Sequence, residues 1–148
     1  MVLNASSLIT FVLTGSIDLL KRCYRQVYVP KAVCDEFSSE FTMPNGVIVR
    51  TLSGPQKAAA EIIGLGEGEN EAMVLARDLG LPLVMDDTDA EKVAAKYDIH
   101  VYHSLEFVRA AYRACFLERD EYDSRVSSFQ ASGRVYPEYI DWARHATK

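Results

Sequence analysis

Short apolar runs alternate along the chain with longer segments in which apolar residues recur at helical spacing. We predict strands at residues 2–3, 27–29, 47–49, 83–85 and 99–102. Each run is followed by a segment whose apolar positions would lie on one face of a helix. Strands that alternate with helices in this way are typical of βαβ units, whose strands run parallel. The pattern therefore predicts an α/β protein with a mostly parallel sheet.

The residues at the ends of the predicted helices match known capping preferences. Ser6 or Ser7 can cap the first helix through its hydroxyl oxygen. Thr88 and Glu91 have the spacing of a capping box and predict another helix start. Gly133 closes a later helical segment, as glycine often does at a helix C-terminus.

No linker, repeat or low-complexity stretch divides the 148 residues. We therefore expect one domain over residues 1–148, with the α/β core over about 2–117 and a helical extension over about 118–148. The extension ends in an aromatic segment that contains Tyr136, Tyr139 and Trp142. These side chains either pack on the body of the protein or contribute an interface.

Composition and cysteine usage exclude several classes of protein. A net charge of −5 argues against indiscriminate binding to phosphate backbones. Cys23, Cys34 and Cys115 are scattered, so buried free thiols are expected rather than disulfides or a zinc site. His100 and His103 have no cysteine or acidic residue at ligand spacing, which further disfavours zinc. The chain also lacks a phosphate-binding glycine motif.

Membrane and export signals are equally absent from the sequence. There is no basic segment followed by an apolar one at the N-terminus, and no apolar stretch of about 18 residues. We therefore expect a cytoplasmic protein that has no membrane partner.

Polar residues stand at the ends of predicted strands or near them. Asn4 ends the first strand, and Asp86 and Asp87 follow the fourth. Glu36 lies in the helix after the second strand, and Glu71 begins the helix before the fourth. Ligands of open parallel sheets bind at the carboxyl ends of the strands. These side chains could therefore converge on one pocket.

A cluster of carboxylates requires a cation or a shared proton. Two ionised carboxylates about 4 Å apart repel by roughly 4 kcal/mol at an effective dielectric constant of about 20. Mg²⁺ and Mn²⁺ suit oxygen ligands of this kind and can activate water for phosphodiester hydrolysis. The candidate residues therefore indicate a divalent metal site.

Each candidate also has a structural interpretation. Asp87 or Thr88 can cap the helix that follows them, and Glu71 can be an acid favoured near a helix N-terminus. Glu36 can be an ordinary exposed helical glutamate. Asp86 differs, because the capping box after it leaves this acid without an expected capping role.

The order of these motifs resembles the PIN domain, the nuclease fold of VapC-type toxins. The likeness covers about Val2 to Leu117 and includes the segments "NASSLI", "VYVPKAVCDEF", "GEGENEAMVLA" and "LPLVMDDTDAEKVAAKYDIHV". It is greatest to a prokaryotic subgroup with Gly-Glu-x-Glu-Ala before the fourth strand and Asp-Asp after it. The resemblance implies a three-layer α/β/α sandwich with the strand order 3-2-1-4-5.

The resemblance also implies roles for particular residues. The implied catalytic residues are Asn4, Glu36, Glu71 and Asp87. The implied ligands of Mg²⁺ or Mn²⁺ are Asn4, Glu71, Asp86, Asp87 and Asp89, and Ser6 is the implied supporting hydroxyl. Asn4 departs from the family, which usually has aspartate at this position. The amide can still coordinate a metal ion, but the lost negative charge should weaken metal affinity.

The implied function is a metal-dependent endoribonuclease that cleaves single-stranded RNA. Similar proteins include toxins restrained by an antitoxin protein, and many are homodimers, so both partners are expected. The alternative is a catalytically weakened PIN-fold module that binds RNA or protein, which Asn4 and the acidic net charge favour. A receiver-like phosphoacceptor is disfavoured, because its acid pair would follow the first strand rather than the fourth.

Overall fold

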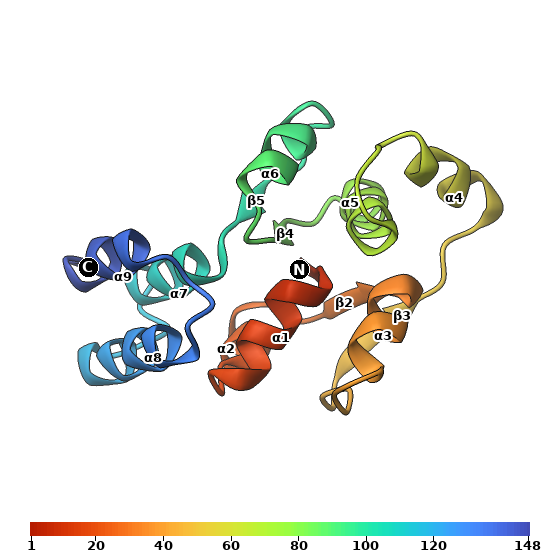
Figure 1. Ribbon diagram of the computed structural model, residues 1–148. Coiled ribbons are helices and arrows are strands. Elements are labelled where there is room, and N and C mark those ends of the chain that lie inside the picture. The colour runs from red at the N-terminus through yellow and green to blue at the C-terminus, as the bar shows by residue number, and fades with distance from the viewer.

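A computed structural model describes residues 1–148 and contains a five-stranded parallel sheet (Figure 1). The strands are β1 (Val2–Leu3), β2 (Val27–Pro30), β3 (Val47–Arg50), β4 (Leu83–Val84) and β5 (Val101–Tyr102). They are ordered β3-β2-β1-β4-β5, and every neighbouring pair is parallel. The α/β class and the strand order are confirmed. The chain first builds the sheet from β1 to β3 and then returns to place β4 on the other side of β1.

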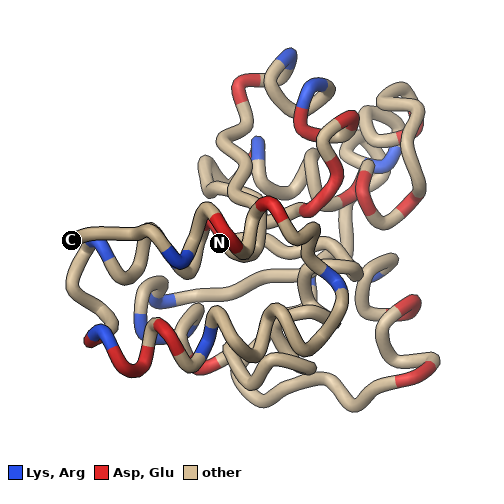
Figure 2. Tube along the Cα trace, turned by 60° about the vertical axis from the view of Figure 1, so that its left-hand side comes forward, with Lys and Arg blue, Asp and Glu red and all other residues tan.

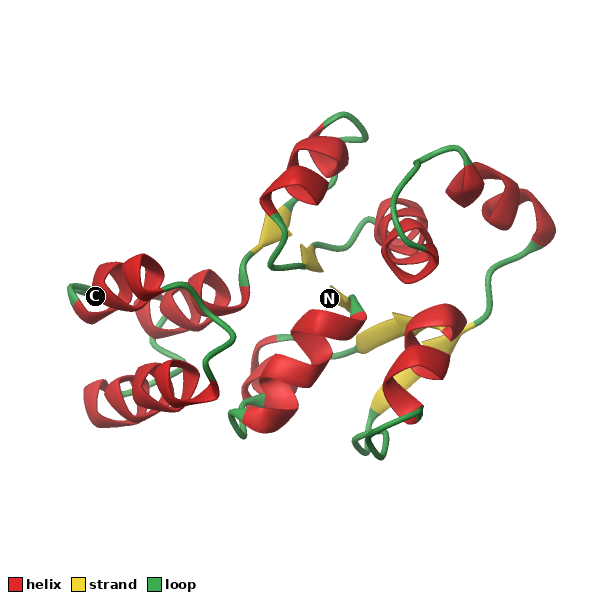
Figure 3. Cartoon of the chain, in the orientation of Figure 1, coloured by secondary structure: helices red, strands yellow, loops and turns green.

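Helices cover both faces of this sheet and complete a three-layer sandwich (Figure 3). They are α1 (Ala5–Leu13), α2 (Ile17–Cys23), α3 (Lys31–Ser38), α4 (Gly54–Glu61), α5 (Glu67–Leu79), α6 (Thr88–Ala95), α7 (Ser104–Arg113), α8 (Arg119–Ser132) and α9 (Pro137–Arg144). Successive strand residues point to opposite faces. Leu3 and Val84 share a core with α1, α2, α3, α7, α8 and α9, whereas Val2 and Leu83 pack with α4, α5 and α6.

The helical extension packs against the larger of the two cores. Phe129 of α8 is fully buried and meets Phe11 of α1 edge to face, with ring centroids 5.9 Å apart. The Tyr122 hydroxyl of α8 donates a hydrogen bond to the Ala143 carbonyl of α9 at 2.7 Å. Ile140 of α9 is buried in the same core. These contacts fix α8 and α9 against the core, and with them the short segment 133–136 that joins the two helices.

Helix α5 begins at Glu67, earlier than the sequence pattern predicts. The residues directly before Glu71 form the first turn of this helix. Gly66 is the N-cap, and its N–H donates to the Glu69 carboxylate at 3.0 Å. Glutamate at this helical position commonly closes a capping box in this way. Consequently Glu71 lies inside the helix and is 6% exposed.

Two expectations drawn from composition have clear outcomes. The three cysteines are free thiols, but Cys23 and Cys34 are half-buried and Cys115 is exposed, so the expected full burial is wrong. No helix combines the length and the apolar character that a membrane span requires.

Candidate functional site

The carboxyl ends of β1 and β4 lie side by side in the middle of the sheet. Leu3 is paired with Val84, and the Asn4 N–H donates to the Val84 carbonyl at 3.5 Å. Asn4 directly follows β1, while Asp86 and Asp87 follow β4 closely. The strand order therefore brings these polar positions to one edge, where open α/β sheets bind their ligands.

The Asn4 side chain has a structural role at the start of α1. Its Oδ1 accepts a hydrogen bond from the Ser7 N–H at 2.9 Å, and the residue is 3% exposed. Asn4 is therefore the N-cap of α1, and the prediction that Ser6 or Ser7 caps this helix is wrong. Asparagine is among the most favourable N-cap residues because its short amide reaches the backbone N–H groups of the first turn.

The two serines after Asn4 differ in their surroundings. Ser7 is fully buried, and its Oγ lies 2.8 Å from the carbonyl oxygen of Val84 and 3.1 Å from that of Asn4. Its hydroxyl thus links the ends of β1 and β4. Ser6, the implied supporting hydroxyl, is exposed and accepts a hydrogen bond from Arg134 at 3.2 Å. The buried hydroxyl that supports Asn4 is therefore that of Ser7.

We expect Ser7→Ala to lower the free energy of unfolding by about 1–3 kcal/mol, because the buried Val84 carbonyl loses the shorter of its two hydrogen bonds. Urea denaturation of the purified chain measures this change. Ser127→Ala on α8 is the matched control, because it removes an exposed hydroxyl that bonds only within its own helix. Equal stability of the Ser7 and Ser127 variants would contradict the proposed link.

Glu71 connects α5 to the start of α3. Its Oε2 accepts a hydrogen bond from the Ala32 N–H at 3.2 Å. Helix α3 follows Pro30 and has no side-chain cap of its own, so the carboxylate satisfies a free N–H at the helix N-terminus. The helix dipole stabilises the negative charge at this end. The other oxygen, Oε1, accepts no hydrogen bond from the chain.

Glu36 is exposed on α3 and lies against the first turn of α5. A Cβ atom placed on Gly68 would approach the Glu36 Oε2 to 3.3 Å. A residue larger than glycine at position 68 would therefore force the Glu36 side chain to shift. No hydrogen bond within the chain uses the Glu36 carboxylate, so both of its oxygens are available to water or a ligand.

Asp87 caps α6, which confirms one of the two predicted alternatives, and the predicted capping box of Thr88 and Glu91 is wrong. The Asp87 Oδ1 accepts hydrogen bonds from the N–H groups of Asp89 and Ala90, each at 2.9 Å. Thr88 is instead the first residue of the helix. The Asp87 Oδ2 accepts no hydrogen bond within the chain, so one carboxylate oxygen is fixed and the other is free.

Asp86 has a capping role that its sequence neighbours did not reveal. Its Oδ1 accepts from the Ser104 N–H at 2.6 Å, and its Oδ2 accepts from the Ser104 hydroxyl at 2.5 Å. The carboxylate therefore binds the N-terminus of α7, so the expectation that it has no capping role is wrong. A metal ion at Asp86 would compete with both bonds. Asp89 is exposed and pairs with Lys92 at 3.2 Å.

The oxygen atoms available here suit a divalent metal ion whose remaining ligands would be water and substrate oxygens. No three His, Cys, Asp or Glu side chains are close enough together to form a metal-holding group by themselves. Mg²⁺, however, commonly uses only one or two carboxylates, several waters and substrate phosphates. The free oxygens of Glu71 and Asp87 are hard donors of this type. The Asn4 amide oxygen is another, although it is already engaged with Ser7.

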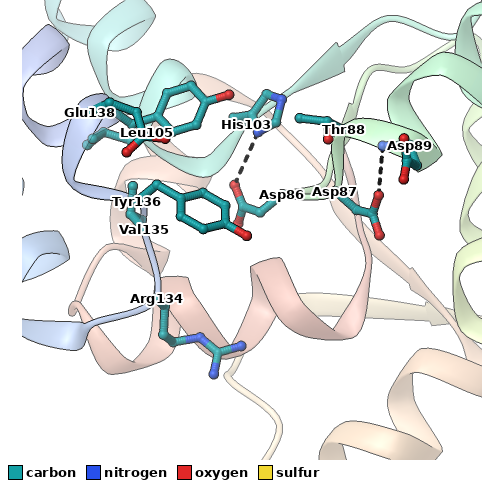
Figure 4. Close-up of a pocket in the computed structure, with 11 residues that line it drawn as sticks. Asp86, Asp87, Thr88, Asp89, His103, Leu105, Arg134, Val135, Tyr136 and Glu138 are labelled. Atoms are coloured by element: carbon teal, nitrogen blue, oxygen red, sulfur yellow. Dashed lines mark hydrogen bonds and ion pairs between the residues drawn. The ribbon is translucent and has the colours of Figure 1, made fainter.

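A pocket of about 400 Å³ lies beside Asp87 (Figure 4). Its lining residues come from the segment after β4, the start of α7 and the segment that leads into α9: Asp86, Asp87, Thr88, Asp89, His103, Leu105, Arg134, Val135, Tyr136, Glu138 and Tyr139. The pocket thus joins the predicted acidic residues to the helical extension.

The sequence pattern missed the part of this site that lies beyond the fifth strand. The His103 Nε2 lies 3.0 Å from the Glu91 Oε2, and its ring stacks on Tyr139 with centroids 5.4 Å apart. Arg134 binds the first turns of α1. These contacts join residues far apart in the chain, so no local spacing indicates them. The run of aromatic residues near the C-terminus was the one available signal.

Comparison with known proteins identifies a family. A family model described as a PIN domain matches residues 1–139. This range contains every predicted site residue, from Asn4 to Asp89, and all the residues that line the pocket. No curated protein matches the chain.

Proposed function

This chain belongs to the PIN domain family, whose fold is of the nuclease type, and from that premise we propose that it is an endoribonuclease dependent on Mg²⁺ or Mn²⁺. Its reaction would be hydrolysis of phosphodiester bonds in single-stranded RNA. The proposed site is the edge of the sheet at the ends of β1 and β4.

One observation carries the proposal. Glu71 and Asp87 each have one carboxylate oxygen fixed by backbone N–H groups and the other free. Capping bonds of this kind hold a side chain in place without using all of its lone pairs. Both carboxylates are thus oriented before any ligand binds, and each keeps one oxygen available to a metal ion.

The remaining residues have supporting roles in this proposal. A bound divalent ion would lower the pKa of a water molecule and neutralise charge that develops on the phosphate. Glu36 is placed to orient a water with its two free oxygens, and Asn4 positions the β1 end next to Asp87. Asp86 and Asp89 stay predictions of the family resemblance, because their observed partners are Ser104 and Lys92.

Cleavage of a labelled single-stranded RNA by the full chain tests the proposal directly. We expect products with Mg²⁺ or Mn²⁺ and none when EDTA removes the metal. Isothermal titration calorimetry with Mn²⁺ alone should detect binding to the wild-type chain. Cleavage that continues in EDTA would contradict the metal-dependent mechanism.

We expect Asn4→Asp to raise the cleavage rate by about tenfold, which corresponds to about 1.4 kcal/mol. The substitution adds a negative charge near the proposed metal ligands, and aspartate caps a helix as well as asparagine. Cleavage rates and thermal unfolding of both proteins measure the two effects. A rate that falls, with unchanged stability, would contradict a metal-binding role for this position.

The Asn4 contacts also favour a second candidate function. Because the amide is used as the α1 cap, its presence can be explained without a metal ion. In this case the protein would be a PIN-fold module that binds RNA or a protein without cleaving it. Absence of Mn²⁺ binding and of turnover, together with measurable RNA binding, would support the module over the nuclease.

The proposal extends to two partners on the basis of the family resemblance. We propose that the nuclease acts as the toxin of a toxin–antitoxin pair and forms a homodimer. Induced expression should arrest bacterial growth, and coexpression of a neighbouring antitoxin gene should relieve the arrest. Light scattering coupled to size-exclusion chromatography measures the oligomeric state.

A further inference from the structure

One wall of the pocket is an aromatic ring that the fold leaves largely uncovered. Tyr136 precedes α9 and is 67% exposed. Figure 4 shows its ring extending into the pocket towards the side where Asp86 lies. No hydrogen bond within the chain uses its hydroxyl. Aromatic side chains usually bury most of their surface, so a ring presented at the mouth of a pocket is available to stack on a flat ligand.

Arg134 supplies a positive charge two residues before this ring. Its Nε donates to the Thr10 hydroxyl at 2.9 Å, and its Nη2 donates to the Ser6 hydroxyl at 3.2 Å. These bonds hold the guanidinium group against α1. Its Nη1 makes no hydrogen bond within the chain, and no carboxylate forms an ion pair with this arginine. The group therefore retains donors for an external anion.

The position of Arg134 reinforces its attraction for an anion. The first turn of α1 contains no acidic residue, so its positive dipole end is not neutralised there. Arg134 is also the only lysine or arginine among the eleven lining residues. The four acidic lining residues, Asp86, Asp87, Asp89 and Glu138, would repel a phosphate that lacked a metal ion. An anionic group would therefore be directed to the arginine.

The rest of the molecule offers no competing basic track. Lysines and arginines are scattered among acidic residues along the chain, which has a net charge of −5 (Figure 2). General attraction to nucleic acid is accordingly weak. Binding would depend on a local site in which one ring and one cation act together.

We propose that this pocket binds one nucleotide of single-stranded RNA, with its base stacked on Tyr136 and its phosphate held by Arg134. The volume of about 400 Å³ is within the range of roughly 300–1,000 Å³ that is typical of small-ligand sites. The stacked pair of His103 and Tyr139 forms a further part of the lining. Only an unpaired base can present its face to a tyrosine, which selects single strands. The choice of RNA as the ligand rests on the proposed function.

Fluorescence anisotropy with a labelled single-stranded RNA of about ten nucleotides tests the site in EDTA, where the proposed cleavage stops. We expect Tyr136→Ala to weaken binding about five- to hundredfold and Tyr136→Phe to bind like the wild type, because the ring is retained. Arg134→Ala should weaken binding and reduce the slope of log K against log salt by about 0.7. Thermal unfolding verifies that each variant is folded.

Two exposed residues outside the pocket provide matched controls. Phe116→Ala removes an exposed aromatic ring, and Arg113→Ala removes an exposed arginine whose side chain makes no hydrogen bond or ion pair. Both controls should bind RNA like the wild type. Equal loss of binding in Arg113→Ala and Arg134→Ala would assign the effect to net charge and overturn the arginine's role.

The outcomes separate this inference from the proposed nuclease activity. If the wild type cleaves RNA but Tyr136→Ala and Arg134→Ala bind it unchanged, the nucleotide site is overturned and the nuclease stands. If the two variants lose binding but the wild type never cleaves RNA with Mg²⁺ or Mn²⁺, the site is supported and the nuclease is overturned. Absence of RNA binding by the wild type overturns the nucleotide site.

Discussion

Asp87→Asn should lower metal-dependent RNA cleavage by about a hundredfold or more while leaving the fold intact. The carboxylate would lose the charge that stabilises a divalent ion, and such an ion contributes several kcal/mol to transition-state stabilisation. The amide oxygen can still accept from the N–H groups of Asp89 and Ala90, because asparagine is as favourable an N-cap as aspartate. Cleavage of labelled RNA under saturating Mn²⁺ measures the loss.

A second substitution at Asp87 and a control elsewhere separate the role of its charge from its role as a helix cap. Asp87→Ala should lose cleavage to the same extent and also lower the free energy of unfolding by about 1 kcal/mol, since the α6 cap is removed. Asp120→Asn in the first turn of α8 removes an exposed carboxylate outside the site and should cleave normally. If Asp87→Asn retained full activity, Asp87 would be a cap only and the proposed site would be wrong.

Glu71→Gln should cause a comparable loss of cleavage with little change in stability. Glutamine retains an oxygen that can accept the hydrogen bond from the Ala32 N–H, but it lacks the negative charge for a metal ion. Glu71→Ala removes both, so we expect it to lose cleavage and about 1–3 kcal/mol of stability. Parallel RNA cleavage and urea denaturation of the two variants separate the charge from the hydrogen bond.

Glu67, an exposed glutamate in the first turn of α5, is the control for Glu71. Glu67→Gln removes one charge from α5 without a hydrogen bond to another element and should behave like the wild type. Full cleavage by Glu71→Gln, together with instability of Glu71→Ala, would restrict Glu71 to supporting α3. The proposal would then lose one of its two oriented carboxylates.

Local sequence patterns determined the class of fold and most of its elements. Apolar runs with helical segments between them predicted five strands in a mostly parallel sheet. Strands that are buried on both faces, as β1, β2 and β4 are, have apolar residues at nearly every position. Gly133 was correctly predicted to end a helix, and it adopts the left-handed conformation there. The strand order came from the order of motifs, which resembles the PIN domain, and the family match supports that resemblance.

The starts of α1 and α6 were predicted less well than the helices themselves. Their caps are Asn4 and Asp87, whereas the pattern placed the first cap at Ser6 or Ser7 and left the second open between Asp87 and Thr88. Both kinds of residue can cap a helix, so propensity alone does not decide which one does so. The local backbone conformation decides it, since Asn4 and Asp87 are the last residues with extended backbone before each helix begins.

The sequence by itself determined which residue types stand near the strand ends, and therefore the chemistry available to this protein. Only the tertiary structure decided how they are used. Asp86 binds Ser104 on α7, Glu71 binds the start of α3, and Arg134 reaches α1. The physical reason is that periodicity records which face of an element is buried, whereas a hydrogen bond between distant residues depends on how whole elements pack together.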